Sequence, residues 1–299
     1  MVVGGSGFIG SAIQRLVLNE KLDDCFVFSH NKNRERIDPN LQTLHLDLLG
    51  DINPEVGEYQ TVIYVAGNAD HGLAKRFPLI DLDLNTRAFV NFMRVYRGKL
   101  VLLSSQAVYY DLEGEIAENV EHVSTMPYGI SKQMTETYAQ YFLKKSDLSQ
   151  LWVIRLAYAY GNGEKKHRLI PRCANAVHRG TEVIIHGGGT SFVNPLPAEF
   201  LAKILLKAAE KPNRDKQGFL EIMNVNYPER VTVKDLISNL YLIRKFNFSV
   251  SDSGEEWPVR FWGNTQKLLR YTKDWNLEFP DLRDSLKSYF TELLQGRED

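Results

Sequence analysis

Runs of consecutive apolar residues alternate with segments of helical periodicity over the first half of the chain. The apolar runs predict buried strands at residues 2–3, 25–28, 61–65, 100–103 and 151–154, and the alternating segment at 41–46 predicts a further strand. Between them, apolar residues three and four apart predict helices at residues 11–19, 85–96 and 128–144. Uninterrupted apolar strands that alternate with helices are typical of a parallel sheet covered on both faces. The pattern therefore predicts an α/β fold built on a doubly wound parallel sheet.

The pattern changes after about residue 160. The periodicity predicts helices at 169–179, 198–210, 232–245 and 282–294, with a short strand at 182–186. We expect a first domain over residues 1–160 that contains the sheet. Residues 161–299 are expected to form mainly a smaller C-terminal α/β domain that binds substrate, with allowance for segments that return to the sheet.

Composition and charge narrow the class of protein. The chain is 43% hydrophobic and 24% charged, and its net charge of −1 gives no electrostatic reason to expect a nucleic-acid or membrane partner. No apolar run reaches the roughly 18 residues of a membrane helix, and no signal-peptide pattern precedes the first strand, so we expect a cytoplasmic protein. Cys25 and Cys173 are predicted to be buried free thiols, and His71, His167 and His186 are too scattered for a metal site.

A glycine-rich turn joins the first strand to the first helix. Gly4, Gly7 and Gly10 fit Gly-x-x-Gly-x-x-Gly, a spacing that allows a tight turn and close approach of the backbone to a pyrophosphate. The helix that follows the turn offers free amides and the positive end of its dipole to the phosphates, and Phe8 and Ile9 within the turn are further candidates for cofactor contacts. The turn predicts a Rossmann-like dinucleotide site. Met1 cuts the first strand short, which leaves open whether the natural start lies upstream.

Further candidates for the cofactor lie at the other strand ends, because ligands of such sheets bind at the carboxyl ends of the strands. Asp47 and Leu48 suit a contact to the adenine, with a solvated surface carboxylate as the alternative. The other candidates at strand ends or on the helices behind them are Ala66, Gly67, Asn85 and Ser104.

The end of the second strand bears on the choice of cofactor. NAD sites usually place Asp or Glu there to bind the ribose 2′-hydroxyl. This chain has a hydroxyl, polar residues and cations instead, which favours a 2′-phosphate and hence NADP over NAD, although a solvated basic loop is the alternative. The residues are Ser29, His30, Asn31, Lys32, Arg34 and Arg36.

Tyr128 and Lys132 form the strongest candidate for catalysis. Their spacing places both on one face of a helix, where the ammonium can lower the pKa of the phenol and hold it ready for proton transfer. Ser105 ends a predicted strand and could hydrogen-bond the same substrate oxygen. An amphipathic helix with a packed tyrosine and a solvated lysine is the alternative interpretation.

These features resemble the extended short-chain dehydrogenase/reductase family, the nucleotide-sugar epimerases, dehydratases and reductases. The opening turn, the pair Asn85 and Asn91, and the segment Ser104-Ser105-Gln106-Ala107-Val108-Tyr109 are similar to motifs of this family over most of the chain. The resemblance identifies Ser105, Tyr128 and Lys132 as catalytic residues, with Tyr128 and Lys132 also contacting the cofactor.

The resemblance implies hydride transfer between NADP, or NAD, and a nucleotide-activated sugar. Gln106 and Ala107 replace the carboxylates that the family's dehydratases use, which leaves reduction of a 4-keto sugar or epimerisation. Substrate contacts are expected from Asn68, Gln106, Tyr158 and Arg260, and Asp70 and His71 are further candidates for the pocket lining. Tyr158 stands where the family commonly has asparagine, and no metal is expected.

The resemblance also implies a homodimer, in which the helices at 85–96 and 128–144 pair across a two-fold axis. Two other functions stay open. One is a non-catalytic sensor or scaffold that binds NADP(H), and the other is a reductase of a small carbonyl compound that carries no nucleotide.

Overall fold

Seven parallel strands form the central sheet of the computed structural model, which describes residues 1–210, 217–254 and 258–296. The strand order is β11-β7-β5-β4-β1-β2-β3. The chain adds β2 and β3 on one side of β1 and the later strands on the other, so the order of the parallel strands switches between β1 and β4. The expected doubly wound, Rossmann-like α/β fold is confirmed. The strands are β1 Val2–Val3, β2 Val27–His30, β3 Gln42–His45, β4 Thr61–Tyr64, β5 Gly98–Ser105, β7 Leu148–Leu156 and β11 Phe219–Val225.

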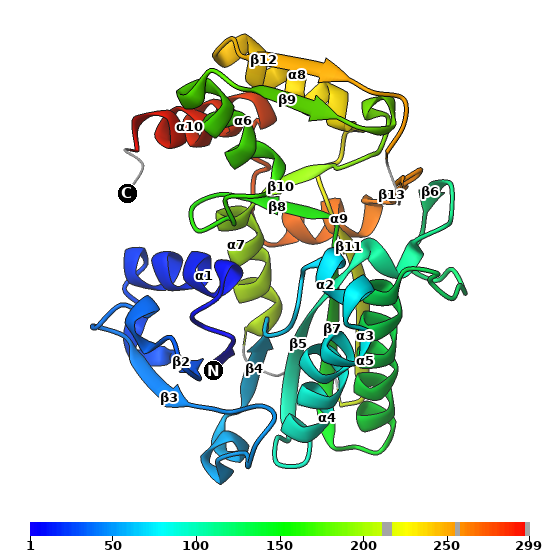
Figure 1. Cartoon of the computed structure of the whole chain (residues 1–299). Helices are drawn as coiled ribbons and strands as arrows, with labels where there is room; N and C mark the ends of the chain where they lie inside the picture. The colour runs from blue at the N-terminus through cyan, green and yellow to red at the C-terminus, as the bar shows by residue number, and fades with distance from the viewer. Residues whose placement is uncertain (211–216, 255–257, 297–299) are drawn as a thin grey trace.

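Helices cover both faces of the sheet (Figure 1). One core joins α1 (Phe8–Asn19), α7 (Ala198–Ala209) and α9 (Gln266–Asp274) to strand residues such as Ile63 and Val101. The opposite core joins α4 (Ala88–Phe92) and α5 (Pro127–Lys144) to their strand neighbours, such as Val62 and Leu102. Successive strand residues therefore enter opposite cores, which explains why these strands have no polar side.

A smaller unit lies beyond the carboxyl ends of the sheet strands, at the top of Figure 1. It has its own apolar core and a two-stranded parallel sheet, β9 with β12. Its elements are α6 Leu169–Arg179, β9 Glu182–Ile185, α8 Val233–Ile243, β12 Asn247–Val250 and α10 Leu282–Gln295. Three elements of the second half, β11, α7 and α9, pack with the main sheet, in line with the expected return of some segments to it. The division into two domains near residue 160 stays a prediction.

Two short strand pairs connect the two units. β8 (Tyr158–Tyr160) pairs with β10 (Pro195–Pro197), and β6 (Gly114–Ile116) pairs with β13 (Phe261–Gly263). A single helical turn, η5 (Gln106–Tyr109), follows β5 directly. These segments fix the ends of β5 and β7 relative to the smaller unit.

The predicted helix over residues 85–96 is wrong in its boundaries. Helical structure begins with α2 (His71–Arg76) and continues as α3 (Pro78–Leu82), a wider π-helical turn at Asp83–Arg87 and α4. Pro78 favours the start of α3 at that position, since proline suits the first helical position, and the Asp70 side chain caps α2. The π-helical turn includes Asn85, whose side chain is buried in the candidate site.

Cys173 is buried as predicted, but Cys25 is exposed, which corrects that prediction. The predicted strand began at Cys25, whereas β2 begins two residues later at Val27. Cys25 instead ends a short 3-10 helix before the strand.

Candidate active site

Ser105 and Tyr128 meet at the carboxyl end of β5. Tyr128 lies in the first turn of α5, which begins at Pro127, and its phenol is hydrogen-bonded to the side chain of Ser105. The Ser105 hydroxyl oxygen also accepts a hydrogen bond from the Ala107 amide at 3.1 Å, which orients it. Both residues are buried, so this contact is shielded from competing water.

Lys132 follows Tyr128 by one helical turn. Its ammonium donates to the carbonyl oxygen of Leu103 in β5 at 2.8 Å and is buried. Burial lowers the pKa of Lys132 to about 8, although Glu136 and Asp81 oppose this change. A buried lysine with a lowered pKa next to a buried tyrosine is typical of a functional site.

The predicted lowering of the Tyr128 pKa is wrong for this structure. Burial raises the pKa of Tyr128 to about 12, and the negative charge of Asp81 adds to the increase. The hydrogen bond from Ser105 and the charge of Arg168 oppose it. The phenol is therefore protonated at neutral pH.

The glycine turn has the tight backbone path that its sequence predicts. Gly4 has a positive φ of 92°, and a side chain at Gly10 would come within 2.4 Å of the Gly4 carbonyl oxygen. Gly7 precedes α1 without a side-chain cap, and the first turn of α1 carries no acidic residue. The amides at Phe8 and Ile9 are thus left for a ligand, as the sequence predicts for the dinucleotide phosphates.

The residues at the end of β2 differ in whether their side chains are exposed or bonded within the protein. The Ser29 hydroxyl is buried and accepts a hydrogen bond from the Gly4 amide at 3.0 Å, so it braces the glycine turn. Arg34 donates to the Ile37 carbonyl oxygen at 2.8 Å, and the His30 ring packs edge-on against His45. The residues of this loop that stay exposed are Asn31, Lys32, Asn33, Glu35 and Arg36.

The loop after β3 is held by its own hydrogen bonds. The Asp47 carboxylate accepts from the Leu49 amide at 3.0 Å, and Leu48 is partly buried against the core. Asn91 donates to the carbonyl oxygens of Leu48 and Gly50 at 3.1 and 2.7 Å. Asn91 therefore positions the segment that the sequence assigns to the adenine.

Asn85 ties the end of β4 to α5. Its side-chain oxygen accepts from the Asn68 amide at 2.9 Å, and its amide nitrogen donates to Asp81 at 2.9 Å and to Ser131 at 3.0 Å. A side chain at Gly67 would come within 2.4 Å of the Asn85 oxygen, so the loop at Ala66 and Gly67 fits closely over it.

Three residues that were expected to contact substrate or cofactor are bonded to other side chains of the protein. Gln106 is buried and donates to Asn226 at 2.6 Å, and the Ser104 hydroxyl donates to Glu136. Arg260 pairs with Glu113 at 2.9 Å on the surface, where both side chains are about two-thirds exposed. Its neighbour Val259 packs near Tyr128 instead.

Tyr158 belongs to a cluster that the sequence did not predict. Its hydroxyl donates to the buried carboxylate of Glu164 at 2.6 Å, and the Arg168 guanidinium lies 4.2 Å from its ring centre. Arg168 also pairs with Glu164 at 3.1 Å. Loop residues give no periodic signal, so these two positions could not be found from the pattern.

Asp81 is a second residue that the sequence analysis missed. Its carboxylate is buried and accepts from Asn68 at 2.7 Å as well as from Asn85. It precedes Asn85 by four positions, a spacing that places both on one helical face and could have indicated it.

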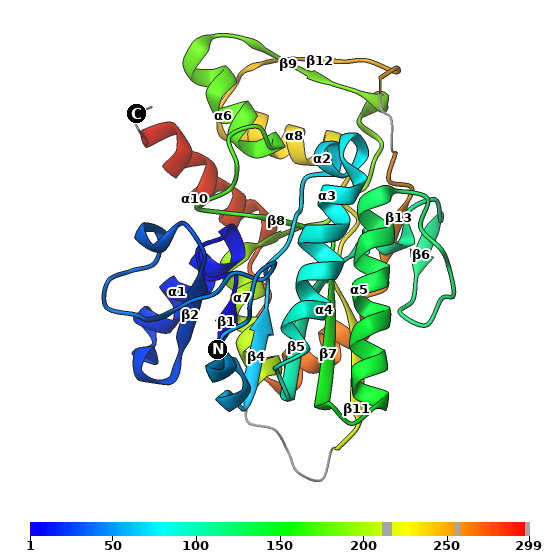
Figure 2. The same ribbon diagram turned by 60° about the horizontal axis from the view of Figure 1, so that its bottom comes forward.

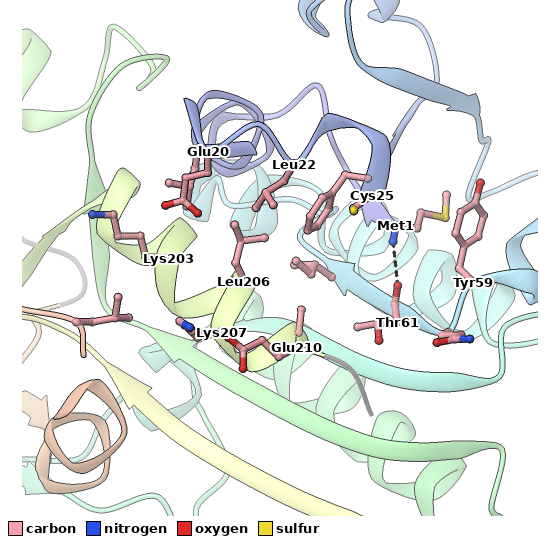
Figure 3. A pocket seen from close by; sticks show the side chains of 16 residues that line it. Met1, Glu20, Leu22, Cys25, Tyr59, Thr61, Lys203, Leu206, Lys207 and Glu210 are labelled. Atoms are coloured by element: carbon pink, nitrogen blue, oxygen red, sulfur yellow. Dashed lines mark hydrogen bonds and ion pairs between the residues drawn. The ribbon is translucent and has the colours of Figure 1, made fainter. Parts of the chain in front are cut away.

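The pocket in Figure 3 lies at the amino ends of the sheet strands, opposite the carboxyl ends where Ser105 lies. It has a volume of about 500 Å³ and is lined by Met1, Thr61 and Lys203 among others. Met1 and Thr61 lie at the amino ends of β1 and β4, whereas Ser105 ends β5. The pocket is therefore separate from the predicted site. Within the described part of the chain, no group of three or more His, Cys, Asp or Glu residues could hold a metal ion.

Comparisons with known proteins agree with this geometry. The model of the NAD dependent epimerase/dehydratase family matches residues 1–225, and the chain belongs to this family. A dTDP-4-dehydro-6-deoxyglucose reductase of Escherichia coli is 24% identical over 275 residues, which cover 80% of each protein.

Solved structures share the fold. MoeE5 in complex with UDP-glucose and NAD has a TM-score of 0.82 at 22% identity, with 97% of this chain and 96% of that chain covered. UDP-glucuronic acid 4-epimerase from Bacillus cereus, in complex with UDP-glucuronic acid and NAD, has a TM-score of 0.82 at 17% identity, with 98% of each chain covered. None of the helices among the described residues is long and apolar enough to span a membrane.

Proposed function

We propose that this protein reduces the 4-keto group of a nucleotide-activated sugar with NADPH. The hydrogen bond between Ser105 and Tyr128 carries this proposal, because it places a proton donor and an orienting hydroxyl at one point of the sheet edge. Lys132 lies one turn further along α5, and the glycine turn ends at the same edge.

The proposed reduction assigns a role to the protonated phenol. When bound, the reduced nicotinamide supplies a hydride to the sugar carbon, and a proton must reach the oxygen of the former ketone. Tyr128, whose pKa is raised to about 12, holds that proton at neutral pH, and Ser105 orients the oxygen.

The proposed preference for NADP depends on the loop after β2. Residues 30–34, directly at the end of β2, contain no Asp or Glu, and three cations stand against one carboxylate, Glu35, over residues 30–36. Lys32, Glu35 and Arg36 are exposed. A 2′-phosphate would gain favourable charge interactions with Lys32 and Arg36, whereas the ribose hydroxyl of NAD would lack its usual carboxylate partner.

The proposed substrate class has two supports. The E. coli relative acts on a dTDP-linked 4-dehydro sugar by its name, and the similarity extends over most of both chains. Gln106 is bonded to Asn226 and Ala107 has no functional group, so neither supplies the acid or base that loss of water would need. Asn68 and Tyr158 are the proposed contacts to the sugar.

We also propose a homodimer in the cytoplasm. Ile130, Met134, Tyr138 and Tyr141 form an exposed apolar stripe along α5, each between 38 and 50% exposed. Leu79, on the adjacent α3, is 76% exposed. Packing of α5 against the same helix of a second copy would bury the stripe and Leu79. The exposed free thiol of Cys25 suits a reducing compartment.

The test is oxidation of NADPH by the purified protein with a panel of 4-keto nucleotide sugars, compared with the variant Tyr128→Phe. We expect wild-type turnover, and a loss of turnover by about 100-fold or more in the variant while NADPH binding is retained. Equal turnover by the two proteins would contradict the assignment of Tyr128. NADPH binding without turnover of any sugar by the wild type would favour a sensor, and turnover of simple ketones alone would favour a small-carbonyl reductase.

A further inference from the structure

A cation lies at the edge of the sheet that carries the predicted catalytic serine. Leu156 ends β7 and pairs with Ser105 of β5, and Tyr158 follows two positions later. The Arg168 guanidinium lies over the Tyr158 ring, 4.2 Å from the ring centre. The fold therefore brings Arg168, from the second half of the chain, to the carboxyl ends of β5 and β7.

The charge of Arg168 also acts on the groups around the predicted catalytic phenol. It opposes the increase in the Tyr128 pKa and contributes to the lowering of the His71 pKa. The ring centre of His71 lies 4.8 Å from that of Tyr128. Both effects agree with the position over Tyr158, since they place the guanidinium on the side of the site where the sugar would bind.

Buried partners hold Arg168 in this position. The Glu164 side chain is fully buried, pairs with the Arg168 Nε at 3.1 Å and accepts from the hydroxyls of Tyr158 at 2.6 Å and Tyr289 at 3.3 Å. The Tyr158 hydroxyl also bonds to Arg168. A guanidinium has five N–H donors, so these two partners leave donors for a ligand. The Arg168 side chain is 28% exposed, which keeps it accessible.

Helix stability alone does not favour an arginine at this position. Arg168 is the N-cap of α6, and its side chain makes no capping hydrogen bond. The helix dipole opposes a cation there, and Lys165, Lys166 and His167 precede it in the sequence. Residues that break a local rule without a local gain are expected at functional sites. The arrangement therefore indicates that Arg168 serves a ligand and not the helix.

The place of this cation indicates which end of the sugar it would contact. In the proposed reduction the reacting carbon is C4, and the diphosphate is attached at C1, across the six-membered ring. C5, which carries C6, is the direct neighbour of C4. A guanidinium on the Tyr128 side of the site therefore suits an anion at C6 better than it suits the diphosphate. A carboxylate matches a guanidinium well, because its two oxygens accept from parallel N–H donors.

We propose that Arg168 is a specificity-determining residue, which binds a carboxylate at C6 of the sugar. This inference rests on the proposed function and names its substrate class as acidic nucleotide sugars. The carboxylate forms and breaks no covalent bond in the hydride transfer, so Arg168 contributes to recognition. Glu164 acts through Arg168 and is a positioning residue.

Two nucleotide sugars that differ only at C6 test the proposal. UDP-glucuronic acid has a carboxylate there, and UDP-glucose has a hydroxymethyl group. The affinity of each is measured by isothermal titration calorimetry with NADPH present, a combination that cannot turn over because both partners are already reduced. The corresponding dTDP-linked pair is measured in parallel, and we expect wild type to bind the acid of at least one pair about tenfold more tightly than the neutral sugar.

The variants separate recognition from support of the fold. Arg168→Gln should abolish the preference for the acid and leave the affinity for the neutral sugar within about threefold of wild type. Arg168→Lys keeps the charge and should retain part of the preference. Arg172→Gln, at an exposed arginine on α6, is the matched control and should retain all of it.

Equal wild-type affinities for the acid and the neutral sugar would overturn the proposal, whatever the variants show. Equal losses of affinity for both sugars in Arg168→Gln would also overturn it, since Arg168 would then only support the shape of the site. Failure of the proposed function is distinguishable, because the wild type would then bind neither sugar of either pair.

Discussion

Tyr128 and Lys132 show what sequence spacing can and cannot establish for single residues. The spacing indicates one helical face, and the structure places both side chains on the sheet side of α5. Spacing alone does not give the burial, which decides the pKa of each group. Where the sequence predicts a phenol with a lowered pKa, the structure therefore has a phenol with a raised pKa.

Burial of Lys132 predicts a specific dependence of stability on pH. Its pKa is about 8 in the folded chain against 10.5 for the unfolded reference, so the unfolded state binds more protons between these values. The free energy of unfolding should therefore rise with pH across this window. Below about pH 8 Lys132 is charged in both states, and the folded state then bears the full cost of burying the ammonium. Relative to Lys132→Met, we expect the wild-type free energy of unfolding to increase by up to about 3 kcal/mol from pH 8 to 10.5.

Urea denaturation at a series of pH values, without added cofactor, measures this difference. Lys144→Met, at an exposed lysine on the same helix, controls for alkaline effects on the rest of the chain. A difference between wild type and Lys132→Met that does not change with pH would show that Lys132 keeps an ordinary affinity for protons in the fold.

Other site residues differ in how far they were predictable. Glycine spacing indicates a turn because few other residues fit it, and Gly4 and Gly10 are in the expected conformation. Gln106 follows a catalytic serine in sequence, yet its side chain turns to Asn226, a partner from a distant strand end. Only the assembled fold shows such a contact.

Among the elements, α5 is joined to the sheet by a buried ion pair. Arg155 of β7 donates to the Glu136 carboxylate at 2.6 Å, and the two side chains are 10 and 4% exposed. Arg155 also donates to the Tyr109 hydroxyl at 2.7 Å. Its donors are therefore shared between two elements that flank Ser105.

Removal of one partner from this pair should destabilise the protein strongly. We expect Glu136→Gln to lower the free energy of unfolding by about 3–5 kcal/mol, because it leaves a buried guanidinium without its counter-charge. Glu113→Gln, which breaks the exposed pair with Arg260, should cost less than about 1 kcal/mol. Chemical denaturation followed by circular dichroism compares them, and equal small losses would argue against a buried pair.

Elements with a continuous apolar character were predictable, and short or mixed ones were not. The helix at Leu169–Arg179 is found where the periodicity predicts it. The strand β11 was missed because Glu221 and Asn224 interrupt its apolar run, and these residues bond to Tyr271 and Tyr109 in the fold. The three-residue strands β6, β8, β10 and β13 have too few residues to show a period.

At the scale of the whole molecule, the apolar stripe on α5 predicts the oligomeric state. A charge in the centre of a paired stripe would be buried without a partner, so Met134→Glu should shift a dimer to a monomer. Leu242→Glu, at a 69% exposed leucine on α8, should leave the dimer intact. Sedimentation velocity of the three proteins measures this, and a wild-type monomer would contradict the prediction.

Both halves of the molecule contribute to the environment of Tyr128. Ser105 and His71 come from the first half, whereas Arg168 and Val259 come from the second. Figures 1 and 2 both show α6, α8 and α10 of the smaller unit above the sheet. The sequence predicts the sheet and its catalytic edge, because these depend on local pattern. It does not predict which loops of the second half reach that edge, because this depends on how the two units pack.

The most direct test of the account follows the hydride itself. NADPH carrying deuterium at the transferable C4 position is incubated with the protein and a 4-keto nucleotide sugar, and the sugar product is analysed by mass spectrometry. The account predicts one deuterium at C4 of a 4-hydroxy product, one NADP⁺ per product and no product with Tyr128→Phe. A sugar that is converted without gaining deuterium and without net oxidation of NADPH would contradict it.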